Sequence, residues 1–145
     1  MKFTSVLLIL GLLIIGSCSD SNELEQVDIQ NYLNNLGRMA IDTAGVYVVI
    51  DQPGSDTRPA ESSIVEMTYT ARYLDDTIFD QSPPDQTIKI KLLTAISGLK
   101  IGVSQFGKDG KGAIIIPSAL GYGNNPPFGV RKDAVLIYNV HVVSF

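Results

Sequence analysis

The side chains in this sequence that could carry chemistry are mainly aromatic and apolar, joined by a few hydroxyls and one carboxylate. The 145 residues include one Cys and one His, so an internal disulfide framework is excluded and a Cys/His metal site nearly so. Catalysis by a Ser-His-Asp or Cys-His arrangement would depend on His141 alone. The remaining set, if it shares one concave face, would line a pocket for a small apolar ligand. Core packing is the simpler explanation for any single member. The set comprises Tyr69, Phe79, Asp80, Ile88, Ile96, Leu99, Tyr122 and Tyr138.

Two other constellations do not support the chemistry that they resemble. The segment from Gly102 to Lys108 matches most of a phosphate-binding loop, but Asp109 stands where a Ser or Thr hydroxyl would hold the metal, so we expect a turn. A group of aspartates lacks the spacing of an EF-hand, so we expect solvated loop carboxylates and no metal. The group comprises Asp75, Asp76, Asp80 and Asp85. Asp80 is the exception, because it directly follows Phe79 at a strand end and we expect it to point inward.

The N-terminal residues have the pattern of an export signal. Lys2 precedes an apolar run of 10 residues, 6–15, which is too short to cross a bilayer as a helix. The following Gly16-Ser17-Cys18 resembles a bacterial lipobox, in which the signal is cut before the Cys and the thiol carries diacylglycerol. We therefore expect a signal peptide at 1–17 and lipidation at Cys18; an ordinary signal peptide that contains a Cys is the alternative. Because Ser19 rather than Asp follows the Cys, we expect an outer-membrane anchor, on the periplasmic or surface side.

The charge balance excludes one class of partner. With 15 acidic and 11 basic side chains the net charge is −4, and a nucleic-acid partner would require a basic face, so we expect none. Removal of Lys2 with the signal would leave −5. An acidic body is not attracted to anionic headgroups, so the lipid itself must hold the protein at the membrane.

A helix is predicted near 24–36, after a polar tether at 19–25. Apolar residues from Val27 to Met39 recur at steps of three and four, and Gly37 ends the pattern. This helix could pack on its own domain, or it could serve as a spacer or a dimerisation face.

Beyond the helix the pattern changes to strands. Residues 65–73 alternate strictly between apolar and polar, which is typical of a strand with one buried face. We expect further strands at 46–50, 78–80, 88–92, 113–116 and 135–143, a hairpin loop at 74–77 and a long loop at 118–133. In the last strand, His141 is out of phase with the apolar positions, so it should face solvent.

A short helix is predicted from the apolar stripe between Ile96 and Phe106. Gly98 and Gly102 weaken it by about 1 kcal/mol each relative to Ala, so packing against the sheet must hold it. The elements together predict an α+β architecture, an antiparallel sheet with one short helix on its concave face.

The order of the segments resembles that of the FKBP-type peptidyl-prolyl cis-trans isomerases. The resemblance extends from about Ser62 to Phe145 and is most specific in 79–82 (Phe-Asp-Gln-Ser) and 117–123 (Pro-Ser-Ala-Leu-Gly-Tyr-Gly). It implies a half-barrel of five or six antiparallel strands wrapped around the short helix. The chain would then divide into a signal (1–17), a lipidated tether with the N-terminal helix (18–44) and an FKBP-like domain (45–145).

The resemblance also implies roles for individual residues. Phe79, Asp80 and Tyr122 would act on the substrate, and the binding surface would comprise Tyr69, Ile88, Ala95, Ile96, Leu99 and Tyr138. Ile88 stands where an aromatic residue is common, Ala95 where a larger aliphatic one is usual, and Leu99 where the family usually has Trp. These departures predict weaker binding of proline and of macrolide ligands than is typical.

Such a pocket would need no cofactor. Rotation of an X-Pro bond breaks amide resonance, with a barrier of about 18–20 kcal/mol, but cleaves nothing. An apolar cavity weakens that resonance and can bind the twisted form preferentially. The sequence therefore predicts an isomerase acting on proline-containing exported proteins. The alternatives are an FKBP-like chaperone or binding module with little isomerase activity, and a structural or adhesive lipoprotein whose aromatic residues are only core.

Overall fold

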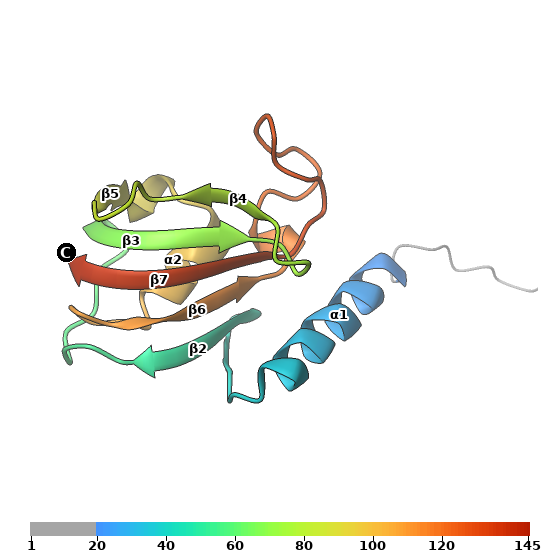
Figure 1. The fold of residues 1–145 in the computed structure, drawn as a ribbon, viewed down its shortest axis with the longest axis horizontal. Helices are drawn as coiled ribbons and strands as arrows, with labels where there is room; N and C mark the ends of the chain where they lie inside the picture. Colours follow the sequence, from blue (N-terminus) through green and yellow to red (C-terminus); the bar gives the residue numbers. More distant parts are fainter. Residues whose placement is uncertain (1–19) are drawn as a thin grey trace, which may run out of the picture.

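The computed structural model describes residues 20–145, which form one antiparallel sheet with two α-helices (Figure 1). The strand order is β1-β2-β6-β7-β3-β4, and β5 also pairs with β3. The elements are α1 (Asp20–Leu36), β1 (Ile41–Thr43), β2 (Val46–Gln52), β3 (Ile64–Arg72), β4 (Ile78–Gln81), β5 (Ile88–Lys91), the 3-10 turn η1 (Leu92–Thr94), α2 (Ser97–Val103), β6 (Lys111–Ile116), the 3-10 turn η2 (Ser118–Leu120) and β7 (Leu136–Ser144). The predicted α+β architecture is confirmed. The described sheet has seven strands because the short β1 adds an edge that the sequence pattern did not indicate.

The two faces of the sheet bury different side chains. The alternation predicted for β3 is confirmed, since Val65, Met67 and Ala71 are buried in the cluster beneath α2. On β7, Tyr138 belongs to the same cluster, whereas Ile137 packs in a second cluster with α1. In Figure 1, α2 lies behind the sheet and α1 lies beside its end. The central strands are therefore covered on both faces, which explains their nearly continuous apolar runs.

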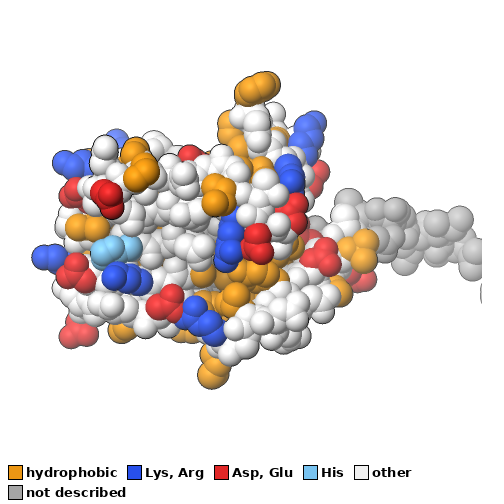
Figure 2. Space-filling view, in the orientation of Figure 1, with side chains coloured by type: hydrophobic (Ala, Val, Ile, Leu, Met, Phe, Trp, Pro, Cys, Tyr) orange, Lys and Arg blue, Asp and Glu red, His pale blue; other side chains and the backbone are white. Residues whose placement is uncertain are grey.

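The helix α1 packs on its own domain. Ile29 is fully buried and Leu33 nearly so, both in the cluster that includes Ile115 of β6 and Ile137 of β7. Figure 2, which looks onto the face opposite α2, shows an apolar area between the strands and α1. The described helix begins at Asp20, so most of the segment expected as a tether is helical instead. Polar residues in this segment have no strong intrinsic preference against a helix that tertiary contacts hold in place.

The two glycines of α2 allow it to lie directly on β6. A Cβ atom at Gly98 would lie 2.2 Å from Cγ2 of Ile116, and one at Gly102 would lie 2.2 Å from Cγ2 of Ile114. Both distances are far below van der Waals contact, so only glycine fits at this separation. The expectation that packing holds this glycine-containing helix is confirmed.

Within residues 20–145, no helix has the length and hydropathy needed to cross a bilayer. The same part of the chain contains no group of three or more His, Cys, Asp or Glu placed to hold a metal ion. The expected signal peptide and Cys18 lie outside the described residues.

Candidate active site

Three aromatic rings from different strands meet on the concave side of the sheet. The ring centroids of Tyr69 (β3) and Tyr138 (β7) are 5.6 Å apart, and those of Phe79 (β4) and Tyr138 are 6.2 Å apart in an edge-on arrangement. Tyr138 is buried, while Tyr69 and Phe79 are half-buried and pack against the core cluster. Antiparallel pairing of β3 with both β4 and β7 brings these residues together from separate parts of the sequence. The rings therefore form one group with partial access to solvent.

Asp80 is joined to this group through a hydrogen bond. The hydroxyl of Tyr69 donates to Oδ2 of Asp80 at 2.5 Å, and the backbone N–H of Gln81 donates to Oδ1 at 2.9 Å. The sequence predicted that Asp80 points inward; the side chain is exposed, and the first bond ties its carboxylate to the Tyr69 hydroxyl. Both oxygens are thus engaged, which fixes the orientation of the carboxylate.

The two tyrosine hydroxyls remain protonated at neutral pH. Burial is the main reason that the pKa of Tyr69 is raised above its usual range, followed by its hydrogen bond to Asp80 and the charge of that carboxylate. Burial likewise raises the pKa of Tyr138, with a further contribution from the neighbouring Tyr122 phenol. The site therefore presents neutral phenols, which suit an uncharged amide.

The segment before α2, the helix α2 itself and the loop after β6 supply the remaining predicted site residues except Ile88. Leu99 is buried in α2, and Ile96, which precedes that helix, is half-buried. Ala95 and Tyr122 are also half-buried and pack against the same cluster. Tyr122 follows the turn η2 (Ser118–Leu120), whose first backbone N–H donates to the carboxylate of Glu25 in α1.

Ile88 is placed differently from the others. It is half-buried on β5 opposite Met67, and it is not among the partly buried residues that pack against the concave cluster. Ile90, its neighbour on the same face of β5, does pack against that cluster. The structure thus gathers eight of the nine predicted site residues around this cluster, if Asp80 is counted through its bond to Tyr69.

The family model for FKBP-type peptidyl-prolyl cis-trans isomerases matches residues 55–143, which is more than half of the chain. The chain belongs to this family. FkpA of Aeromonas hydrophila is 26% identical over 102 residues, covering 70% of this chain and 38% of that protein. FkpA of Escherichia coli K12 is 25% identical over 116 residues, covering 79% of this chain and 43% of that protein. The chain therefore spans less than half the length of these curated relatives.

Solved structures support the fold. A peptidyl-prolyl cis-trans isomerase from Pseudomonas syringae matches with a TM-score of 0.75 at 22% identity, covering 89% of this chain and 96% of that one. The crystal structure of E. coli FkpA matches with a TM-score of 0.74 at 22% identity, covering 87% and 61%. At this identity the likeness concerns the FKBP fold alone.

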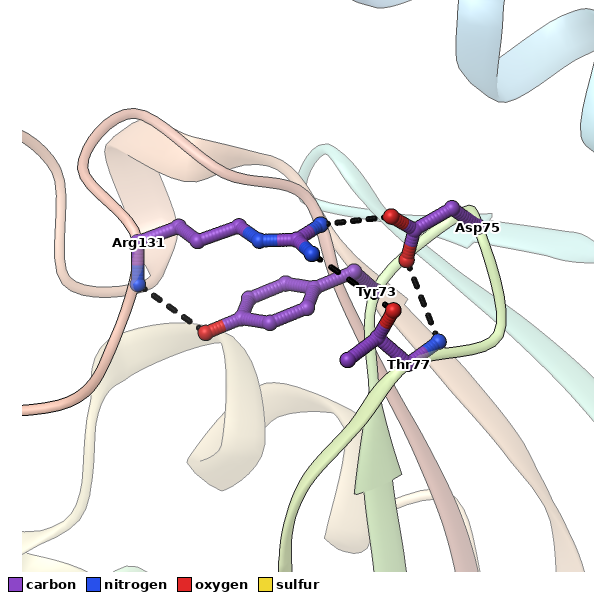
Figure 3. A network of polar contacts seen from close by, with 4 residues as sticks. All are labelled: Tyr73, Asp75, Thr77 and Arg131. Atoms are coloured by element: carbon purple, nitrogen blue, oxygen red, sulfur yellow. Dashed lines mark hydrogen bonds and ion pairs between the residues drawn. The ribbon is translucent and has the colours of Figure 1, made fainter.

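Two residues outside the predicted set extend the aromatic group of this FKBP domain, one directly and one through the first. Tyr73 is buried and stacks on Phe79, with centroids 4.7 Å apart. Arg131 lies over the Tyr73 ring at 4.3 Å and pairs with Asp75 at 2.7 Å (Figure 3). The β3 alternation already placed Tyr73 on the inner face, but no sequence signal indicated that Arg131 would reach it.

The remaining candidate groups in the FKBP domain are structural or solvated. Asp75 and Asp76 are exposed, as expected, but each is paired, with Arg131 and Arg72 respectively. Asp85 is exposed in a turn. His141 is half-exposed and lies opposite Thr68 on the outer face, as its phase predicts.

Two hollows lie beside the predicted site rather than within it. One of about 660 Å³ is on the outer face, lined mainly by polar residues that include Thr68 and His141. The other, about 790 Å³, lies between the first turns of α1 and the loop after β6. Tyr69 is the only predicted site residue that lines either hollow. Neither is the apolar proline pocket expected from the sequence.

Proposed function

We propose that this chain is a peptidyl-prolyl cis-trans isomerase that acts on exported polypeptides through its concave aromatic group. The observation that carries the proposal is the convergence of Tyr69, Phe79 and Tyr138 from three strands, with two of the rings half-open to solvent. A set of residues that served only as core would be buried throughout. Membership of the FKBP family supports the same reaction.

Desolvation is the proposed source of catalysis. A planar amide is more dipolar than a twisted one, so transfer of the X-Pro bond from water to apolar ring faces lowers the barrier to rotation. Proline would insert against Tyr69, Phe79 and Tyr138, with Ile96 and Leu99 beneath it. An acceleration of a thousandfold requires only about 4 kcal/mol of preferential stabilisation.

Two polar groups would orient the substrate. The Tyr122 hydroxyl is the proposed donor to a substrate carbonyl. Asp80 lies near the twisting carbonyl as a fixed carboxylate, because Tyr69 and the Gln81 N–H hold both of its oxygens. We assign no proton transfer to Asp80, since no bond to hydrogen is made or broken in the rotation.

Replacing Tyr122 by Phe should slow the reaction without unfolding the protein. The change removes one hydroxyl from a half-buried side chain, so we expect kcat/KM to fall about 3- to 10-fold, the value of one hydrogen bond. The measurement is the slow, proline-limited phase in refolding of a test protein, with the full chain in mild detergent as catalyst.

Tyr47→Phe is the matched control for this experiment. The Tyr47 hydroxyl donates to Gln26 of α1 on the other side of the sheet, so its loss should leave the refolding rate unchanged. A wild-type chain that does not accelerate the slow phase would contradict the isomerase proposal. Equal rates for Tyr122→Phe and wild type would contradict the role of Tyr122 alone.

We further propose that a lipid on Cys18 anchors the domain to a bacterial membrane, as the lipobox-like Ile15-Gly16-Ser17-Cys18 suggests. Incorporation of labelled palmitate in bacteria tests this: wild type should be labelled and Cys18→Ser should not. Labelling of both, or of neither, would refute the anchor at Cys18.

A further inference from the structure

Arg131 joins the loop after β6 to the hairpin between β3 and β4 through several contacts at once (Figure 3). Its guanidinium donates to Oδ2 of Asp75 at 2.7 Å, approaches Oγ1 of Thr77 at 3.5 Å and lies over the ring of Tyr73 at 4.3 Å. Its backbone N–H donates to the Tyr73 hydroxyl at 2.9 Å. We refer to Arg131, Tyr73, Asp75 and Thr77 as the Arg131 clasp.

The hairpin side of the clasp leads directly to Phe79. Tyr73 is 5% exposed and stacks on Phe79 with ring centroids 4.7 Å apart and an interplanar angle of 27°. The turn that carries Asp75 is itself ordered, because the Thr77 N–H donates to Oδ1 of Asp75 and the Tyr73 N–H donates to the Thr77 carbonyl. Arg131 therefore rests on a rigid support that is continuous with one wall of the aromatic group.

The loop side of the clasp leads to Tyr122. The backbone N–H of Asp133, two residues after Arg131, donates to the carbonyl of Gly123 at 2.8 Å. Gly123 directly follows Tyr122, so this bond closes the base of the loop next to that side chain. Between these points most residues are exposed, including Asn124, Asn125 and Phe128, and few backbone bonds cross the loop. Loops with few such bonds belong to the least stable parts of a domain.

We propose that Arg131 is a positioning residue that holds the Tyr122 side of the active site at a fixed distance from the Phe79 side. This inference rests on the proposed isomerase function, because it assigns Tyr122 and Phe79 to one substrate pocket. Without the clasp, substrate binding would have to order the loop. Such an ordering cost weakens ground-state and transition-state binding alike, and therefore appears in KM rather than in kcat.

The charges around the clasp are consistent with a persistent contact. Arg131 and Asp75 are each about half-exposed, so the pair is accessible to salt. The Arg131 hydrogen bond, with a smaller contribution from the Thr77 N–H, lowers the pKa of Asp75 to about 2. The carboxylate therefore stays charged at every pH at which a refolding assay is run, and acid pH is not a way to open the clasp in that assay.

Arg131→Ala in the full chain tests the inference. We expect KM for a proline-containing substrate to rise about 5-fold with kcat unchanged within twofold, the effect of adding a loop-ordering cost to binding. Arg131→Lys keeps the charge but loses the planar guanidinium that pairs with Asp75 and lies over the Tyr73 ring. Its KM should therefore lie between that of the wild type and that of Arg131→Ala. Added salt should raise the KM of the wild type and leave that of Arg131→Ala unchanged.

Two further variants identify the contact through which Arg131 acts. Asp75→Asn should raise KM by about as much as Arg131→Ala does. The variant that combines both changes should have a KM no higher than that of either single variant. Lys132→Ala removes the neighbouring exposed cation and should leave KM unchanged. A purely structural role would instead lower apparent kcat with KM intact, and that result would overturn the inference.

The outcomes separate the two proposals. If the wild type accelerates refolding and KM changes less than twofold in Arg131→Ala, the positioning inference is wrong and the isomerase proposal stands. If the wild type does not accelerate refolding at all, the isomerase proposal fails and the inference that rests on it fails too. Equal KM increases in Arg131→Ala and Lys132→Ala would also refute the inference, since they would indicate a general charge effect.

Discussion

Phe79→Ala should reduce kcat/KM for X-Pro rotation by about 10- to 100-fold, corresponding to about 1.4–2.7 kcal/mol of lost transition-state stabilisation. Phe79 contacts both Tyr138, edge-on at 6.2 Å, and Tyr73, stacked at 4.7 Å. Its loss would remove one apolar wall and admit water to the twisting amide. Because desolvation is the proposed source of catalysis, no other single side-chain truncation in the site should have a larger effect.

The adjacent residue provides a matched control for this prediction. Ile78 is 54% exposed and precedes Phe79 on β4, so its side chain points to the other face of the strand. Ile78→Ala should leave kcat/KM within twofold of wild type. Phe79→Leu, which keeps an apolar side chain, should have a kcat/KM between that of Phe79→Ala and that of the wild type. Circular dichroism must show that each variant is folded, and equal activity of folded Phe79→Ala and Ile78→Ala would exclude Phe79 from the site.

Periodicity predicted the parts of this protein that depend on which face of an element a residue occupies. The alternation in β3 placed Val65, Met67 and Tyr69 on one side, and the same parity placed Tyr138 on the inner and His141 on the outer side of β7. These assignments follow from the period of a strand alone. The family resemblance then related separate elements to one another, and family membership is now shown by the match over 55–143.

Contacts between segments that are distant in sequence were not predictable in this way. Arg131 and Asp75 are 56 residues apart, and Arg72 reaches Tyr32 of α1 across 40. Both pairs depend on how distant segments pack together, which no periodic pattern encodes. The start of α1 was missed because residues 20–23 are polar and give no apolar periodicity, whereas buried residues further along, such as Ile29, hold the helix in place.

Ile88 shows what the alternation of side chains along a strand cannot predict. It alternates correctly in β5, and the family position suggested a binding role, yet it does not pack against the concave cluster. The strand β5 pairs only with β3 and lies off the main path of the sheet. The alternation gives the face of the sheet on which a residue lies, but not how far along the strand it lies from the site.

Gly102→Ala should destabilise the protein by about 2 kcal/mol, although alanine is the better helix former by about 1 kcal/mol. The new Cβ would lie 2.2, 2.8 and 2.9 Å from three side-chain atoms of Ile114. Ile114 is fully buried in β6, which pairs with β2 and β7 on its two sides, so it cannot move away easily. Thermal unfolding should show a Tm lower by roughly 5–10 °C.

A double-mutant cycle identifies the cause of that destabilisation. Ile114→Ala alone creates a cavity and should also destabilise the protein, by about 2–5 kcal/mol. If steric overlap is the cause, the added methyl group of Gly102→Ala occupies part of that cavity, and the double variant should be more stable than the sum of the single effects by about 1–3 kcal/mol. Ser97→Ala, at an exposed position of the same helix, should change stability by less than about 0.5 kcal/mol.

The same substitution connects packing with activity. Leu99 lies between Gly98 and Gly102 in α2, is 5% exposed and belongs to the core cluster against which the aromatic group packs. Displacement of α2 from β6 would push Leu99 toward the rings and narrow the space for proline. The folded fraction of Gly102→Ala should therefore have a lower kcat/KM than wild type, and the Ile114→Ala background should restore part of it. Full activity in a destabilised Gly102→Ala protein would show that Leu99 is not the floor of the proline site.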